Sequence, residues 1–125
     1  MARLLVVDDE PDICTLVVRR LVAQGHEVVS AHDAVTALAL VEEHGRPDAA
    51  VLDVDLPGMD GLELLEQLRR RFPALPALFL TVLWDGDVHT RIRAAGAGYA
   101  AKPFTGASLA DAVRQILPAT PAVDP

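Results

Sequence analysis

The sequence predicts a doubly wound α/β fold, in which a five-stranded parallel sheet carries helices on both faces. Short aliphatic segments alternate five times with segments whose apolar residues recur at spacings of three and four. The aliphatic segments are continuously apolar, as expected for strands buried on both faces, and strict alternation implies right-handed crossovers. The length of 125 residues suits one domain and is too short for two ordinary ones.

The first two strand–helix pairs are predicted between residue 3 and about residue 45. Residues 3–7 form a valine-rich strand that ends in three acids, and residues 11–24 form an amphipathic helix. Pro11 suits the first turn of this helix and Gly25 suits its end. Residues 27–31 return to strand character. The second helix is marked by Val35, Leu38 and Val41 and stops near Gly45.

The other three pairs are predicted between residues 49 and 118. Strands are expected at 49–53, at 77–81 and, as a short one, at 99–101. The helices that follow are marked by Leu62, Leu65, Leu68 and Phe72, by Val88, Ile92 and Ala95, and by Leu109, Val113 and Ile116. Residues 1–118 are therefore expected to form the domain, and the proline-rich residues 119–125 a tail or the start of a linker.

Composition narrows the class of protein. A 51% apolar fraction with 23% charged residues is typical of a folded domain. No apolar run is long enough to span a membrane, and no secretion signal is recognisable, so cytoplasmic residence is expected. The single cysteine, Cys14, has no disulfide partner in the chain. The net charge of −7 disfavours direct binding to nucleic acid or anionic lipid.

Unusual polar residues stand at four predicted strand ends. These are Asp8 and Asp9, Asp53, Thr81 and Lys102. They should converge, because the carboxyl ends of parallel strands meet at one edge of the sheet. Clustered carboxylates need a cation, and an all-oxygen set suits Mg²⁺. With a lysine and a threonine beside them, one carboxylate could act as the nucleophile in phosphoryl transfer.

Each of these residues also has an ordinary structural interpretation. Asp8 and Asp9 could cap a helix, Asp53 could accept loop hydrogen bonds, and Lys102 could be a surface charge. The joint occurrence of a compatible set at four strand ends favours a functional site.

Four segments resemble the signature segments of bacterial response-regulator receiver domains, the CheY-like family. They are VVDDE at 6–10, LDVDLPGMDG at 52–61, FLT at 79–81 and GAGYAAKPF at 96–104. Their order and spacing agree with the family from about residue 3 to residue 117. The resemblance implies a flavodoxin-like (βα)5 sandwich with strand order 2-1-3-4-5.

By this resemblance, Asp53 accepts the phosphoryl group. Asp9 and Asp53 would bind Mg²⁺ directly, Asp55 would contribute its backbone carbonyl, and Asp8 would hold a metal-bound water. Lys102 would pair with the phosphoryl oxygens.

The resemblance also implies a switch. Thr81 would move to bond a phosphoryl oxygen, and Tyr99 would change rotamer with it. The Lys102–Pro103 peptide bond is normally cis in the family. Val82 departs from the small residue usual after the threonine, and could slow phosphorylation or dephosphorylation.

The partners implied are a sensor histidine kinase or a histidine phosphotransfer protein, and a downstream output domain or protein. The face formed by residues 87–117 is the family's usual output surface, where homodimerisation is plausible. No direct nucleic-acid or membrane partner is expected. On sequence alone, Tyr99 could equally be a packed aromatic. Trp84 is read as a loop residue and His26, His32, His44 and His89 as solvated or capping residues.

Two other functions remain open. Asp53-Val54-Asp55 also resembles the nucleophile motif of haloacid-dehalogenase-type phosphatases, although that motif usually follows their first strand in a longer chain. A phosphorylation-independent receiver, which only binds a partner, is the third possibility.

Overall fold

The computed structural model describes residues 2–81, 86–102 and 104–117. It contains one five-stranded parallel sheet with the strand order β2-β1-β3-β4-β5. The strands are β1 Arg3–Val7, β2 Glu27–Ala31, β3 Ala49–Asp53, β4 Ala77–Thr81 and β5 Gly98–Ala101. The predicted fold class and strand order are confirmed. The predictions for Val82, Trp84, Pro103 and residues 119–125 concern positions outside the described residues.

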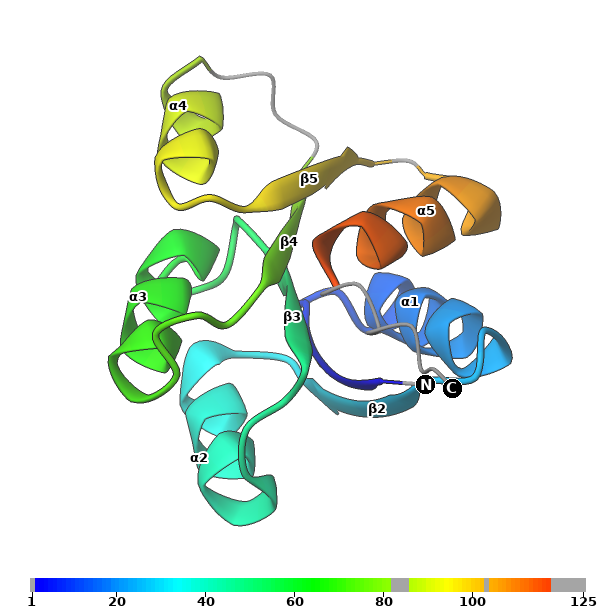
Figure 1. Cartoon of the computed structure of the whole chain (residues 1–125), viewed down its shortest axis with the longest axis horizontal. Coiled ribbons are helices and arrows are strands. Elements are labelled where there is room, and N and C mark those ends of the chain that lie inside the picture. Colours follow the sequence, from blue (N-terminus) through cyan, green and yellow to red (C-terminus); the bar gives the residue numbers. More distant parts are fainter. Residues whose placement is uncertain (1, 82–85, 103, 118–125) are drawn as a thin grey trace, which may run out of the picture.

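In the described part of the chain five helices cover the sheet. Figure 1 shows that α1 and α5 lie on one side, and α2, α3 and α4 on the other. Their bounds are α1 Pro11–Ala23, α2 Ala34–His44, α3 Gly61–Arg71, α4 Gly86–Ala94 and α5 Gly106–Ile116. The first helix ends one residue earlier than predicted because Gln24 is its C-cap. Among the described residues, no helix is both long and apolar enough to cross a bilayer.

Side chains that alternate along each strand feed two separate cores. Leu4 and Val6 of β1 pack under α1 and α5, whereas Leu5 and Val7 pack under α2 and α3. This explains why the strands lack polar residues at every second position: both faces of the sheet are covered. The apolar pattern of β1 is broken at Asp8, directly after the strand.

The start of α3 lies directly behind the end of β3. Asp60 is the N-cap of α3, and its carboxylate accepts a hydrogen bond from the Glu63 amide at 2.8 Å, while Glu63 accepts one from the Asp60 amide at 3.0 Å. This reciprocal cap fixes where the helix begins. The next residue, Gly61, is buried against the main chain, so that a Cβ there would lie 2.1 Å from the Asp53 carbonyl oxygen.

Candidate functional site

A pocket of about 210 Å³ opens at the carboxyl edge of the sheet. Its lining combines residues from four strand ends, those of β1, β3, β4 and β5: Asp9, Glu10, Asp53, Val54, Asp55, Thr81 and Lys102. The strand-end residues singled out from the sequence therefore meet in space, as parallel topology predicts. Asp8 joins these residues through its ion pair with Lys102.

Asp53 ends β3 and is nearly inaccessible, with 4% of its surface exposed. Its Oδ1 accepts a hydrogen bond from the Asp55 amide at 3.1 Å, and its Oδ2 lies 3.4 Å from the Lys102 ammonium nitrogen. Burial raises the pKa of Asp53 to about 6. The negative charge of Asp8 adds to this rise, and the positive charge of Lys102 opposes it. Its carboxylate is thus held at both oxygens and ionised at neutral pH.

Asp8 is fully buried just beyond β1. Its Oδ1 accepts a hydrogen bond from the Glu10 amide at 2.9 Å, and no side chain caps α1, whose N-cap is Glu10. The helix-capping interpretation of Asp8 is therefore wrong. Its Oδ2 forms an ion pair with Lys102 at 3.1 Å, but among the described residues no donor reaches it with hydrogen-bond geometry. A buried carboxylate oxygen in that situation favours a cation nearby.

Lys102 is the positive centre of the site. Its amide donates a hydrogen bond to the Thr81 carbonyl at 2.9 Å, so its position depends on the pairing of β4 with β5. Its side chain is 8% exposed, and its ammonium nitrogen also lies 3.6 Å from a Glu10 oxygen. Burial alone would lower the pKa of Lys102, but the charges of Asp53 and Asp8 outweigh it and the net pKa is raised. The surface-charge interpretation of Lys102 is wrong.

The carboxylates could hold a divalent metal ion. One oxygen each from Asp8, Glu10 and Asp53 lies within 4.8 Å of the others, and carboxylate oxygens are the ligands that Mg²⁺ prefers. Three negative groups share one lysine here, so a divalent cation would complete the neutralisation. Asp9, predicted as a direct ligand, is exposed and lines the same pocket without joining this cluster.

The two predicted switch residues lie on neighbouring strands. Thr81 ends β4 and is 6% exposed at the pocket wall. Tyr99 of β5 is 43% exposed, so it is not a packed core aromatic. Its ring meets the His89 ring of α4 edge to face, with the ring centres 4.6 Å apart.

Two residues near the site were not singled out from the sequence. Glu10 belongs to the acidic cluster, and His89, read as a solvated or capping residue, packs on Tyr99. A signal existed for Glu10: in an extended segment residues two apart face the same side, which pairs Glu10 with Asp8. No local pattern marks His89.

Comparison with protein families gives a match to the family "Response regulator receiver domain" over residues 4–114. The probable transcriptional regulatory protein TcrX of Mycobacterium tuberculosis is 42% identical over 104 residues, which are 81% of this chain and 43% of TcrX. The response regulator MprA of Mycobacterium avium is 41% identical over 118 residues, which are 92% of this chain and 50% of MprA. The chain thus spans half or less of the length of these relatives.

Solved structures include close structural matches. The chemotaxis protein CheY4 of Vibrio cholerae superposes with a TM-score of 0.87 at 32% identity, covering 94% of this chain and 99% of CheY4. The receiver domain of NtrX from Brucella abortus gives a TM-score of 0.84 at 35% identity, covering 94% and 99% of the two chains.

Proposed function

Because the chain belongs to the family of response regulator receiver domains, which act in two-component signalling, we propose that Asp53 is the phosphoryl acceptor of a signalling switch. The observation that carries the proposal is the setting of Asp53. It is a buried carboxylate at the wall of an open pocket, held by the Asp55 amide and by Lys102.

In the proposed transfer, a carboxylate oxygen of Asp53 attacks phosphorus. An O–P bond forms, and the bond from phosphorus to the donor's imidazole nitrogen or, for a small donor, to its acyl oxygen breaks, with the electron pair leaving on that atom. Lys102 would pair with the phosphoryl oxygens. Its contact with Asp53 at 3.4 Å supports this role, because charge developing on the phosphoryl group would appear beside it.

We propose Mg²⁺ as the metal, with Asp9, Asp53 and the Asp55 carbonyl as direct ligands and Asp8 acting through a water. When bound, Mg²⁺ supplies positive charge to the carboxylates and the incoming phosphoryl group. The shared pocket of Asp9, Asp53 and Asp55 supports this set, and Glu10 is a further candidate because its carboxylate approaches those of Asp8 and Asp53.

The proposed response is a population shift between two conformations. Thr81 would bond a phosphoryl oxygen and Tyr99 would change rotamer as it does so. The strand register supports coupling between Thr81 and β5, which carries Tyr99. Thr81 pairs with Ala101, and its carbonyl accepts a hydrogen bond from the Lys102 amide. The two switch residues thus lie on one pair of hydrogen-bonded strands, β4 and β5, and Lys102 directly follows β5.

The proposed partners are a histidine kinase or phosphotransfer protein upstream and an output domain or protein downstream. TcrX is a probable transcriptional regulatory protein more than twice as long as the matched part, which supports an output domain beyond the receiver. Homodimerisation through α4, β5 and α5 is a further proposal. The place of action would be the cytoplasm, which is typical of the family.

Magnesium is expected to raise the melting temperature. At a free Mg²⁺ concentration of about 100 times the dissociation constant, binding to the folded state alone adds about 2.7 kcal/mol of stability. Thermal unfolding with MgCl2 and with NaCl at equal ionic strength measures this. An equal melting temperature in the two salts would contradict the metal site. Asp9→Asn and Glu10→Gln then show which of these two residues binds the metal. Only the variant of the binding residue should lose the rise in melting temperature with Mg²⁺.

The function is tested by intact mass after incubation with acetyl phosphate. Wild type is expected to gain one phosphoryl group with Mg²⁺ and none without it, and Asp53→Ala to gain none. Equal labelling of Asp53→Ala would exclude Asp53 as the acceptor. Absence of labelling from both a small donor and a kinase would favour a receiver that signals without phosphate.

A different measurement, hydrolysis of phosphate esters, tests the phosphatase alternative. Members of the receiver family are not classical enzymes, and the family match covers residues 4–114. We propose that the only turnover is self-phosphorylation followed by hydrolysis of the aspartyl phosphate. Sustained hydrolysis of phosphate esters, abolished by Asp53→Ala, would revive the phosphatase interpretation.

A further inference from the structure

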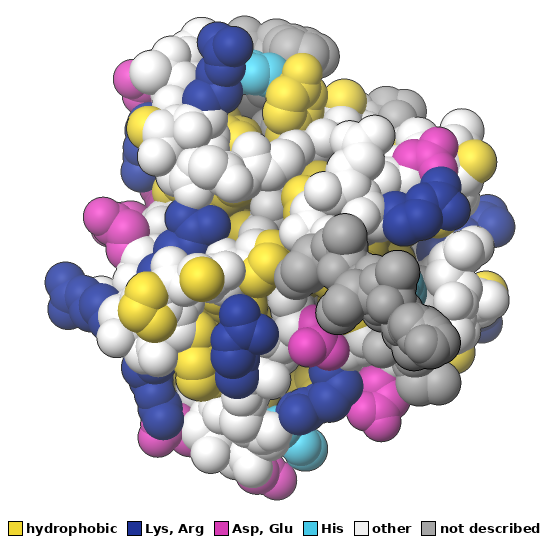
Figure 2. Space-filling model, in the orientation of Figure 1, with side chains coloured by type: hydrophobic (Ala, Val, Ile, Leu, Met, Phe, Trp, Pro, Cys, Tyr) yellow, Lys and Arg dark blue, Asp and Glu magenta, His cyan; other side chains and the backbone are white. Residues whose placement is uncertain are grey.

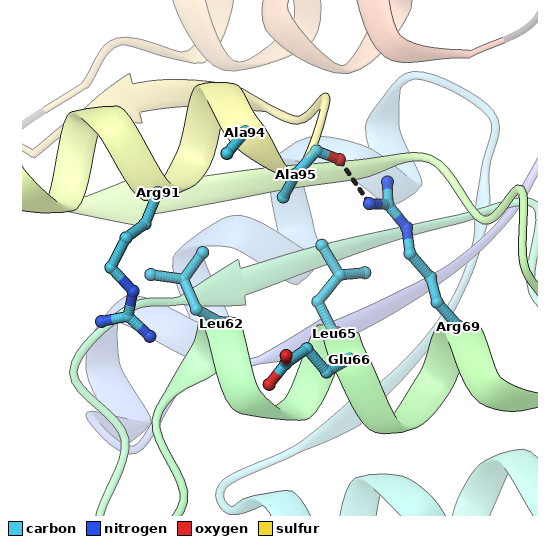
Figure 3. Close-up of a pocket in the computed structure, with 7 residues that line it drawn as sticks. All are labelled: Leu62, Leu65, Glu66, Arg69, Arg91, Ala94 and Ala95. Carbon is cyan, nitrogen blue, oxygen red and sulfur yellow. Dashed lines mark hydrogen bonds between the residues drawn. The ribbon is translucent and has the colours of Figure 1, made fainter.

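A cavity of about 340 Å³ lies between α3 and α4 (Figure 3). Leu62 and Leu65 point into it from α3, and Ala94 and Ala95 line it at the end of α4. Because of this cavity, the two helices are not packed together along their length. At one end, Arg91 of α4 reaches the N-cap residue Asp60 in an exposed ion pair of 3.7 Å.

At the other end, Arg69 of α3 connects two loops. Its Nε and Nη2 donate to the Leu75 carbonyl at 3.1 and 3.0 Å, and its Nη1 donates to the Ala95 carbonyl. The dashed line in Figure 3 marks the contact with Ala95. A planar guanidinium suits this task, because its donors point in fixed directions and can serve two acceptors at once.

The chemistry at the end of α4 explains why the Ala95 carbonyl needs a donor. The helix closes through hydrogen bonds from the Gly96 amide to Arg93 and from the Ala97 amide to Ile92, with Gly96 at φ 65°. This ending uses the carbonyls of Ile92 and Arg93, and within the part of the chain that the structure describes no main-chain amide outside the helices and strands donates to the Ala95 carbonyl. The positive charge of Arg69 also interacts favourably with the negative, C-terminal end of the α4 dipole.

The two carbonyls that Arg69 binds precede the two switch strands. Leu75 lies just before β4, which ends at Thr81, and Ala95 lies just before β5, which carries Tyr99. In addition, α4 contacts Tyr99 directly through His89. Any displacement of α4 relative to α3 therefore reaches Tyr99 both along the chain and through this ring contact.

We propose that Arg69 is a positioning residue of the switch, which holds the approaches to β4 and β5 at a fixed separation and so keeps Tyr99 in its unphosphorylated conformation. This rests on the proposed function of Asp53. In the absence of the Arg69 contacts, α4 can shift into the neighbouring cavity, and the second Tyr99 conformation becomes more populated without phosphate.

Arg69 differs from the other arginines of this region. Figure 2 shows basic side chains over the part of the surface formed by α3 and α4, among others spread over the same face. Arg70, Arg71, Arg91 and Arg93 are exposed, whereas Arg69 is half-buried and makes three donor contacts to main chain. Arg70, the next residue in α3, is therefore a matched control for charge and helix position.

The experiment uses the single tyrosine of the chain. Labelling with 3-fluorotyrosine gives one ¹⁹F resonance, which reports on Tyr99 alone. Spectra are recorded for wild type, Arg69→Met, Arg69→Lys and Arg70→Met, before and after phosphorylation with acetyl phosphate and Mg²⁺. We expect the unphosphorylated Arg69→Met resonance to move or broaden toward the phosphorylated wild-type position, as the minor population rises about tenfold.

Arg69→Lys should give an intermediate displacement, because one ammonium can bind one of the two carbonyls, and Arg70→Met should match wild type. A wild-type resonance in Arg69→Met, even with reduced stability, would overturn the proposal. If Arg69→Met does not fold, an unshifted Arg69→Lys resonance would overturn it. Intact mass of the wild type separates the two proposals. Absence of labelling by both acetyl phosphate and a kinase would contradict the phosphoacceptor, whereas a displaced resonance in unphosphorylated Arg69→Met, with none in Arg70→Met, would still show that Arg69 positions Tyr99.

Discussion

Lys102→Met is expected to slow Mg²⁺-dependent labelling of Asp53 by about 100- to 1000-fold, the usual loss when one preorganised charge is removed from a transfer site. Methionine keeps much of the length and removes the charge. The ammonium nitrogen lies 3.4 Å from Asp53 and 3.1 Å from Asp8, so both the nucleophile and the phosphoryl group lose their positive neighbour. The rate of mass gain with acetyl phosphate measures the effect.

The same substitution should make stability depend more strongly on pH. Burial raises the pKa of Asp53 to about 6 and Lys102 opposes the shift, so the pKa rises further in the variant. Between the unfolded pKa and this raised pKa the folded state binds more protons, so its stability falls as pH rises. We expect Lys102→Met to lose about 1 to 3 kcal/mol near pH 7 and less near pH 5, because protonation of Asp53 limits the cost.

Urea unfolding at the two pH values measures this difference. Arg93→Met, which removes an exposed positive charge from α4, is the matched control and should behave as wild type. Labelling of Lys102→Met at the wild-type rate, or a stability loss that does not depend on pH, would contradict the role given to Lys102.

Gly61→Ala is expected to destabilise the fold by about 2 to 4 kcal/mol, because the added methyl overlaps main chain that cannot move aside. An ideal Cβ would lie 2.1 Å from the Asp53 carbonyl oxygen and 3.2 Å from the Val54 Cα. The first turn of α3 must then shift away from β3, which disturbs the contact of the Gly61 amide with the main chain next to Asp53. We therefore expect slower phosphoryl labelling together with a lower urea midpoint.

Gly86→Ala provides the matched control at the start of another helix. A Cβ there meets nothing within 4 Å. It should leave stability unchanged or raise it by a few tenths of a kcal/mol, since alanine restricts the unfolded chain. A Gly61→Ala variant as stable as Gly86→Ala would show that α3 is free to move away from Asp53.

Much of this architecture follows from local sequence. The continuous apolar segments and the three- and four-residue spacings locate all ten elements, because a parallel sheet buried on both faces leaves few other arrangements for such a pattern. The meeting of Asp53, Thr81 and Lys102 also follows, since parallel strands place their carboxyl ends at one edge.

The direction of individual side chains could not be read from composition. Asp8, Asp9 and Glu10 are adjacent acids, yet Asp8 is fully buried, Glu10 joins its cluster, and Asp9 faces solvent at the pocket. Their separation depends on the hydrogen bond from the Glu10 amide to Asp8, a detail of one turn. The individual metal-binding roles of these residues stay predictions.

Contacts between distant segments were equally hidden. Arg69 lies in a run of three arginines, and only the fold singles it out by bringing Leu75 and Ala95 within its reach. In the same way His89 meets Tyr99 only because α4 lies over β5. No periodicity in the sequence encodes such pairs, because they depend on how separate elements are placed.

Chemical mapping of the acyl phosphate tests the central claim most directly. After incubation with acetyl phosphate and Mg²⁺, reduction with borohydride converts a phosphorylated aspartate to homoserine, which peptide mass spectrometry can locate. In the wild type we predict homoserine at position 53 and at no other aspartate. We predict no homoserine when Mg²⁺ is omitted. Homoserine at Asp8, Asp9 or Asp55 in place of Asp53 would contradict the account.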